Sequence, residues 1–88
     1  MEQEKVIAAA CKVFTDENFF IVTAERHVDV RESLYCANIK YNNITDGFWT
    51  NKDRFVSRVE AKKIAVAANQ LIVPVEETYP ELYSEDVW

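Results

Sequence analysis

The chain has 88 residues, a mass of 10.2 kDa, a formal net charge of −5 and a pI of about 4.8. This length allows one domain, and 49% apolar with 28% charged residues is typical of a globular protein and not of a disordered chain. The acidity argues against long nucleic acid as a partner, because displacing counterions from phosphates requires a surplus of Lys and Arg.

The charge is distributed unevenly along the chain. Residues 1–75 hold ten acidic and ten basic side chains, whereas residues 76–88 hold five acidic side chains and no basic one. From Lys52 to Lys63, five basic residues stand against two acidic ones. The sequence therefore predicts a neutral domain over residues 1–75 with one basic segment, and an acidic, aromatic arm over 76–88 that docks on the domain or on a neighbouring subunit.

The first third of the chain predicts a hairpin followed by a helix. Residues 5–14 form an apolar run with β-branched ends, and the turn residues 15–18 separate it from a second β-rich run at 19–23. The alanine triplet in the first run would suit a helix equally well. From His27 the spacing changes to three and four, which is typical of a helix of about three turns that reaches Asn38.

The middle of the chain predicts a loop and a second hairpin. Residues 38–46 are polar and are interpreted as the loop, which ends in the turn dipeptide Asp46-Gly47. The single glycine of the chain indicates a position where the backbone needs a positive φ or a close approach. Residues 48–50 and 54–56 then predict the two short strands of the hairpin.

A Ser-x-x-Glu capping box at residues 57–60 predicts the start of a second helix, which should end near Asn69 or Gln70. The remaining segment has two prolines and no clear period, which predicts an extended arm anchored by apolar side chains: Tyr79, Leu82, Tyr83, Val87 and Trp88. Together these elements predict an α+β fold, with a small antiparallel sheet from two hairpins, two helices packed on one face and an extended C-terminal arm.

Several function classes are disfavoured. The acidic first residues and the six-residue apolar run that follows predict neither a signal peptide nor a membrane partner. Cys11 and Cys36 stand apart in apolar contexts and are interpreted as reduced packing residues, so no metal and no cofactor is expected. With one histidine and no nucleophile beside a base in a recognisable motif, the chain is not expected to be an enzyme.

A candidate ligand site lies at the start of the second helix. The free N–H groups beyond Ser57 and the guanidinium groups of Arg54 and Arg58 together suit an anion the size of a phosphate. Phe48 and Trp49 on the preceding strand could stack a base, which would make a nucleotide pocket. Periodicity alone favours a plainer alternative, in which the basic side chains form a solvated helix face and the two aromatic residues alternate between core and surface.

Arg26 and His27 form a second candidate cluster, because they follow the first hairpin and begin the first helix. Their side chains could face a groove or a neighbouring subunit. For His27 the simpler interpretation is a hydrogen-bonded or exposed capping residue, and for the pair it is structural capping.

Three segments taken together resemble a known family: 8–30, 47–61 and 82–88. Their most specific parts are the Arg-Phe-x-x-Arg-x-Glu-Ala stretch that begins at Arg54 and the Ser-Glu-Asp-x-Trp sequence that begins at Ser84. In these segments the chain resembles the first Thoeris anti-defence family, small phage-encoded proteins that sequester cyclic ADP-ribose signals made by bacterial TIR-domain enzymes.

The resemblance implies a non-enzymatic sponge in the cytoplasm of the infected bacterial host. It implies a homo-oligomer, a dimer or a hexamer, with ligand pockets at subunit interfaces, and some relatives also bind cyclic oligonucleotides at separate sites. Carried over by motif, Phe48 would stack an adenine, and Arg58 with Ser57 would lie by the phosphates or riboses. Arg26 and His27 match the usual Arg-His pair of the family, as structural or pocket-lining residues.

The chain departs from the family where glycine is expected, at Ala24, Asp53 and Asn69. Asp and Asn adopt the left-handed conformation more readily than most residues, so these turns can form without glycine. The exact loop geometry, and therefore the choice of ligand, can differ from that of the family. The segment before Gly47 is also short, so contacts that the family makes from a longer insertion can be missing.

Two functions follow from these observations. The first is capture of a small phosphorylated nucleotide signal, a cyclic nucleotide of host immunity, without cleavage. The alternative is an acidic phage protein that inhibits a host protein by direct binding or by mimicry of nucleic acid. Capture requires Phe48, Arg54 and Arg58, whereas mimicry requires the carboxylates from Glu76 to Asp86. Hydrolysis of the signal is disfavoured by the lack of a placed nucleophile.

Overall fold

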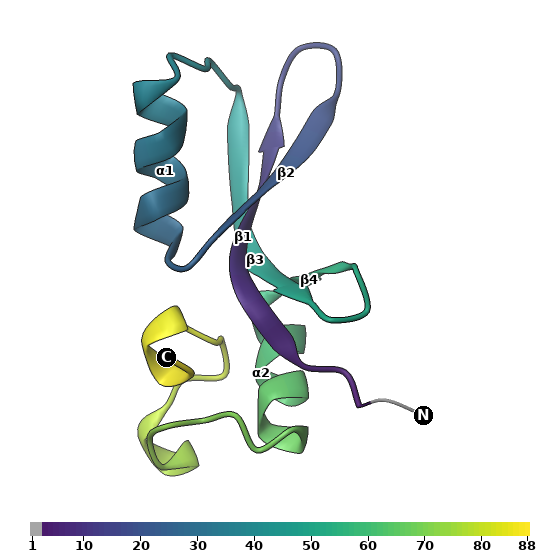
Figure 1. Ribbon diagram of the computed structural model, residues 1–88, viewed down its shortest axis with the longest axis vertical. Helices are drawn as coiled ribbons and strands as arrows, with labels where there is room; N and C mark the ends of the chain where they lie inside the picture. Colours follow the sequence, from purple (N-terminus) through teal and green to yellow (C-terminus); the bar gives the residue numbers. More distant parts are fainter. Residues whose placement is uncertain (1–2) are drawn as a thin grey trace.

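A four-stranded antiparallel sheet and two helices make up the fold in the computed structural model, which describes residues 3–88 (Figure 1). The sheet has the order β2-β1-β3-β4, so the central pair β1–β3 joins two hairpins. This confirms the predicted α+β class. The elements in chain order are β1 (Val6–Phe14), β2 (Phe19–Ala24), α1 (His27–Cys36), β3 (Asn43–Thr50), β4 (Phe55–Ser57) and α2 (Arg58–Ala67), followed by the 3₁₀ turns η1 (Val75–Glu77) and η2 (Ser84–Asp86).

Both helices cover the same face of the sheet. Side chains alternate between the faces of a strand, and Ala9, Cys11 and Val13 of β1 are all buried on one of them. Their partners on β3 are Phe48, Asp46 and Ile44. The buried residues of α1 pack on the part of this face around Cys11, and those of α2 pack on the part around Phe48. The sheet therefore has one helical face and one open face.

Two apolar clusters lie under the helices. The cluster beneath α1 is built from residues between Cys11 and Ile44. The cluster beneath α2 contains Val6 from the start of β1 together with Leu82 and Val87 from the arm. The second cluster is thus completed by side chains from both ends of the chain.

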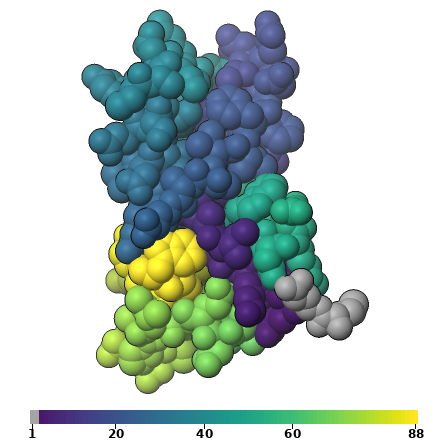
Figure 2. Space-filling view, in the orientation of Figure 1, coloured from purple at the N-terminus to yellow at the C-terminus, as the bar shows by residue number. Residues whose placement is uncertain are grey.

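The C-terminal arm packs on its own domain. The main-chain N–H of Leu82 donates to the carbonyl of Arg58 over 3.0 Å, and the indole N–H of Trp88 donates to the carbonyl of Glu25 over 2.7 Å. The arm therefore bridges the start of α2 and the entrance of α1, and Figure 2 shows its yellow end between the blue and green parts of the surface. Tyr79 is 69% exposed, so the prediction that it anchors the arm is wrong.

Gly47 lies inside β3 and not in a turn, because β3 begins at Asn43 and the predicted loop is shorter than expected. Its φ is not positive. A Cβ at this position would lie 2.3 Å from the carbonyl oxygen of Val56 and 2.4 Å from Cζ of Phe55. The prediction of a close approach is confirmed, and the prediction of a turn is wrong.

Positive φ values occur instead at Asn38, Asp53 and Asn69, which have φ of 56°, 57° and 56°. Asn38 and Asn69 follow the C-terminal ends of α1 and α2, and Asp53 lies in the turn between β3 and β4. Asn69 ends its helix in the left-handed conformation as predicted, although α2 itself stops two residues earlier, at Ala67.

Candidate functional site

The start of α2 is capped as its sequence predicts. Ser57 has an extended backbone, with φ −67° and ψ 165°, and its Oγ accepts a hydrogen bond from the N–H of Glu60 over 3.1 Å. The carboxylate of Glu60 binds Arg54, with Oε1 2.9 Å from Nη2. Ser57 therefore fixes the first turn of α2 and the position of the residue that follows it, Arg58.

Arg58 is held from two sides. Its Nη2 lies 3.1 Å from Oδ2 of Asp46, and its guanidinium group lies over the ring of Tyr83, 5.0 Å from the ring centre. The side chain is 24% exposed. Its Nε is buried, and within residues 3–88 it has no hydrogen-bond acceptor. Arg58 is thus a rigid cation at the surface with an unused donor.

Asp46 connects Arg58 to two further groups. Nη2 of Arg31 lies 2.8 Å from Oδ1, and the thiol of Cys11 donates to the same oxygen over 3.3 Å. Burial acts to raise the pKa of Asp46, but the hydrogen bonds from Arg31 and Cys11 and the charge of Arg58 outweigh it and lower that pKa. One carboxylate between two guanidinium groups leaves a cluster with a surplus positive charge.

A cleft of about 430 Å³ lies beside this cluster. The short β4 pairs only with Gly47–Trp49 of β3, so the first half of β3 has an unpaired edge, and the cleft lies along that edge and the start of α2. It is lined by Ile44, Thr45, Asp46, Ser57, Arg58, Val59 and Glu81. The site is therefore a shallow surface cleft with Arg58 as its cation.

Phe48 and Trp49 do not lie together. Phe48 has no exposed surface, and its ring meets the edges of His27 and Trp88 at centre-to-centre distances of 5.0 and 6.4 Å. It cannot stack an adenine from this position, so the structure contradicts the use that the resemblance implied for it. Trp49 is half-buried on the open face, away from Arg58. The two residues alternate between core and surface, as the plainer alternative stated.

Arg54 is occupied by carboxylates of its own chain. Its Nε and Nη2 donate to the two oxygens of Glu4 over 2.6 and 2.7 Å, and Nη2 also lies 2.9 Å from Glu60. Thr50 donates to the same Glu4 carboxylate over 2.7 Å. The basic segment predicted between Lys52 and Lys63 is therefore partly neutralised by Glu4, which is far away in sequence.

The Glu4–Arg54 pair predicts a specific pH dependence. The hydrogen bond from Arg54 is the main cause that lowers the pKa of Glu4 to about 2. A lowered pKa gives stability that is present at neutral pH and is lost as the pH falls through the folded value. We expect Glu4→Gln to melt below the wild type at pH 7, and the two melting temperatures to converge between about pH 4.5 and 2. A difference that stays constant down to pH 2 would contradict this assignment.

His27 is buried and serves the fold. Its Nε2 lies 2.7 Å from the carbonyl oxygen of Gly47 and must carry the proton, because a carbonyl only accepts. Burial is the main cause that lowers the pKa of His27, so the ring is neutral at pH 7. Arg26 lies beside the arm, with Nη1 4.0 Å from Glu85. Arg26 is the N-cap residue of α1 but makes no side-chain capping hydrogen bond, so the prediction of side-chain capping is wrong, whereas the prediction of a hydrogen-bonded His27 is confirmed.

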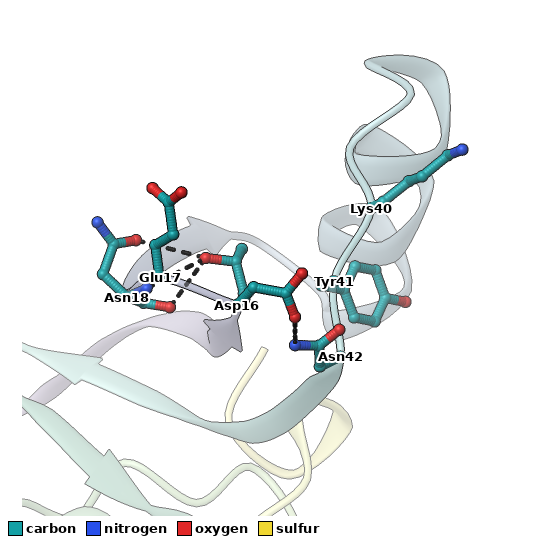
Figure 3. A pocket seen from close by; sticks show the side chains of 7 residues that line it. Asp16, Glu17, Asn18, Lys40, Tyr41 and Asn42 are labelled. Carbon is teal, nitrogen blue, oxygen red and sulfur yellow. Dashed lines mark hydrogen bonds between the residues drawn. The ribbon is translucent and has the colours of Figure 1, made fainter.

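A second hollow, of about 320 Å³, lies between the β1–β2 turn and residues 40–42 (Figure 3). Nδ2 of Asn42 donates to Asp16 over 2.6 Å across one side of it. It lies at the hairpin tip, away from α2, and no predicted site residue lines it.

Within residues 3–88, no three His, Cys, Asp or Glu side chains are placed to hold a metal ion. In the same described part of the chain, every helix is too short or too polar to span a membrane.

The site residues that the sequence missed are Arg31, Asp46 and Tyr83. Arg31 stands four residues after the buried His27 on α1, and Asp46 stands two residues before the buried Phe48 on β3. Residues at these spacings share a face of a helix or a strand, so the sequence could have indicated that both side chains lie between α1 and the sheet. Tyr83 was predicted only as an anchor of the arm. Its contact with Arg58 depends on where the arm docks, which no local pattern indicates.

The chain was compared with protein families, curated proteins and solved structures. No curated protein and no solved structure matches it. The sequence model of the phage T4 y16D protein family matches residues 5–88, which is almost the whole chain. The chain therefore belongs to the phage T4 y16D protein family and is a phage protein.

Proposed function

We propose that this phage protein binds and sequesters a small cyclic nucleotide signal of host immunity, of the cyclic ADP-ribose type, without cleaving it. Cyclic oligonucleotides are a second ligand class for it, and the host cytoplasm is the compartment in which it acts. The observation that carries the proposal is Arg58, a cation fixed at the edge of a cleft beside the first turn of α2.

Arg58 suits a phosphate because its position is set before any ligand arrives. Asp46 and Tyr83 fix its guanidinium group on two sides, so little side-chain freedom is lost on binding. The N–H groups and the dipole of the first turn of α2 point to the same region. Bidentate donation to phosphate oxygens is a property of Arg that Lys lacks.

Arg31 is a second cation beside the site, although it does not line the cleft itself. It shares the Asp46 carboxylate with Arg58, and its side chain is 42% exposed. A phosphate that approaches this pair meets two guanidinium groups and one carboxylate. Two acids, Asp46 and Glu81, also line the cleft; Asp46 is occupied by Arg31 and Arg58, and the phosphate is expected on the Arg58 side, away from Glu81.

Aromatic surface near Arg58 comes from the arm. The ring of Tyr83 lies under the guanidinium group, and the ring of Tyr79 lies 6.0 Å from that of Tyr83 at an angle of 76°. Tyr79 is exposed and is free to stack on a base. We assign to these tyrosines the contact with the nucleobase that the buried Phe48 cannot make.

Binding without turnover is supported by the state of two reactive side chains, Cys11 and His27. Burial is the main cause that raises the pKa of Cys11 to about 12, so it is a thiol and not a thiolate nucleophile. His27 uses its Nε2 in the hydrogen bond to Gly47. Both side chains serve the fold.

Self-association is part of the proposal. Sequestration requires stoichiometric, tight binding, and pockets shared between rigid subunits would provide more contacts than the shallow cleft of one chain. A dimer or a hexamer is the expected assembly.

Inhibition of a host protein is the second candidate. Glu76, Glu77, Glu81 and Glu85 are all exposed on the docked arm, which presents their carboxylates in a fixed arrangement. This function predicts that substitution of these residues abolishes activity and that Arg58 has no part in it.

The proposal is tested by following the fate of the ligand. The protein is incubated with cyclic ADP-ribose isomers, the free ligand is measured, and the sample is heated and measured again. Depletion followed by recovery of intact ligand is the expected result. A chemically altered product would show turnover, and an absence of depletion would favour the host-protein alternative.

Arg58→Ala is expected to weaken ligand binding by about 10- to 100-fold, because a charge-assisted hydrogen bond contributes about 1.5–3 kcal/mol. The fold should survive, since Asp46 keeps its bonds to Arg31 and Cys11. Isothermal titration calorimetry measures the affinity. Lys63→Ala, which removes an exposed cation one turn further along α2, is the control and should bind like the wild type. Equal affinities of the two variants would remove Arg58 from the site.

A further inference from the structure

The open face of the sheet is a surface that neither helix covers. Both helices pack on the opposite face, as the alternation of β1 and β3 shows. The side chains on the open face, identified by strand register, are Ala8, Ala10, Lys12, Phe14, Phe19, Ile21, Thr23, Asn43, Thr45, Trp49, Phe55 and Ser57, with Gly47 between them.

This face is aromatic and free of carboxylates. Phe19 is 53% exposed, and Phe14, Ile21, Trp49 and Phe55 are half-buried. Lys12 is its one charged residue, and the ammonium group of Lys12 lies 4.4 Å from the ring centre of Phe19. The chain as a whole has a net charge of −5, so a face that carries no acidic side chain differs in charge from the rest of the surface.

The size of the face suits an interface. At the usual spacing of strands and residues, it covers on the order of 400 Å² in projection. An exposed apolar patch of about 300–600 Å² is often functional in a monomeric protein. With the turns at both ends included, two copies would together bury on the order of 1,000 Å² of surface. This is about the smallest total buried area of a specific protein–protein interface.

We propose that a second copy of this chain covers the open face, with the two sheets packed face to face and their strands running in opposite directions. This deepens the self-association in the proposed function by naming its surface. It can be tested without any ligand, so it can fail while the proposed function stands.

Charge complementarity between the two ends of the sheet favours this partner and this direction. The turn between β1 and β2 carries Asp16 and Glu17, both exposed. The opposite end carries the exposed Lys5 and Lys52, which are brought together by the hydrogen bond from the N–H of Asn51 to the carbonyl of Lys5. Among residues 3–88 at that end, Asp53 is the acid outside the ion pairs, since Glu4 and Glu60 are bound to Arg54.

A two-fold axis that lies between the two sheets, perpendicular to the strands, therefore places the acidic turn of each copy over the basic end of the other. The symmetry makes this contact at both ends of the interface. The same rotation places each strand over its own counterpart, so Phe14 of one copy lies over the end of β1 that carries Ala8 in the other, next to Trp49. Aromatic pairs across a two-fold interface add stability beyond the area that they bury.

The first test measures the mass of the protein in solution by light scattering and sedimentation. The wild type is expected as a dimer or a multiple of one. Thr23→Arg places a charged side chain at an exposed strand position of the open face, in the row of Ala10 and Gly47 and away from the cleft that Thr45 lines, and should weaken association by about 100-fold, because two such charges then lie close to each other. Tyr35→Arg makes a similar change on the outer surface of α1, where Tyr35 is 86% exposed, and should leave the mass unchanged.

The second test reverses charges at the two ends. Glu17→Lys and Lys52→Glu should each weaken association by about tenfold, and the double variant should recover most of the loss. Circular dichroism confirms the fold of each variant. A wild type that stays monomeric at millimolar concentration, a Thr23→Arg variant that keeps the wild-type mass, or a double variant without recovery would each overturn the proposal. Loss of ligand binding in an intact dimer would count against the proposed function alone.

Discussion

Phe48→Ala is expected to lower the free energy of unfolding by about 3–5 kcal/mol. The ring has no exposed surface and lies between His27, Trp88 and the apolar residues under α2, so its removal leaves a cavity that the surrounding β-sheet cannot close. A domain of this size has a total stability on the order of 5–10 kcal/mol. Urea denaturation followed by tryptophan fluorescence measures the loss, and the variant should be largely unfolded at 37 °C.

Val28→Ala is the matched control, because Val28 is 65% exposed on the first turn of α1. Its effect should remain within about 0.5 kcal/mol. If Phe48→Ala were as stable as this control and lost only ligand binding, the ring would belong to a ligand site, as the family resemblance implies, and not to the core.

Gly47→Ala is expected to lower the free energy of unfolding by about 3 kcal/mol, although the added group is one methyl. The Cβ would lie 2.3 Å from the carbonyl oxygen of Val56, which is main chain and cannot move without breaking the β3–β4 pairing. Thermal unfolding measures the effect. Since β4 leads directly into Ser57, the variant should also displace the start of α2 and weaken ligand binding.

The control for this prediction separates the two atoms that the methyl would meet. Phe55→Leu in the Gly47→Ala background removes the ring that lies 2.4 Å from the Cβ but leaves the carbonyl of Val56 in place, so it should restore little stability. Full recovery in the double variant would show that the ring, and not the main chain, sets the requirement for glycine.

Local chemistry explains which parts of the fold could be predicted from the sequence. Ser57 and Asn69 delimit α2 through bonds and dihedral angles within a few residues of themselves, so their sequence signals are direct. The two hairpins are specified in the same way by β-rich runs and turn residues. The start of β3 was missed because Asn43 and Asp46 are poor strand formers, and pairing with β1 overrides that preference.

The candidate site could be predicted only in part, because its geometry depends on contacts between distant segments. Alternation requires that Phe48 and Trp49 point to opposite faces, but it does not say which one faces the helices. The ion pair of Arg54 with Glu4 and that of Arg31 with Asp46 form only when β1, β3 and the helices are assembled. Arg58 was predicted from the capping motif, whereas the residues that hold it were not.

The division of the core into two clusters has a consequence for the order of folding. The cluster beneath α1 joins residues between Cys11 and Ile44, so its loops are short and it can form early. The cluster beneath α2 contains both Val6 and Val87, so it can form only when the two ends of the chain come together. Closing a loop of this length is slow. We therefore expect hydrogen exchange during refolding to protect the hairpin β1–β2 and α1 first, and the Arg58 site to become competent for binding only in the last step.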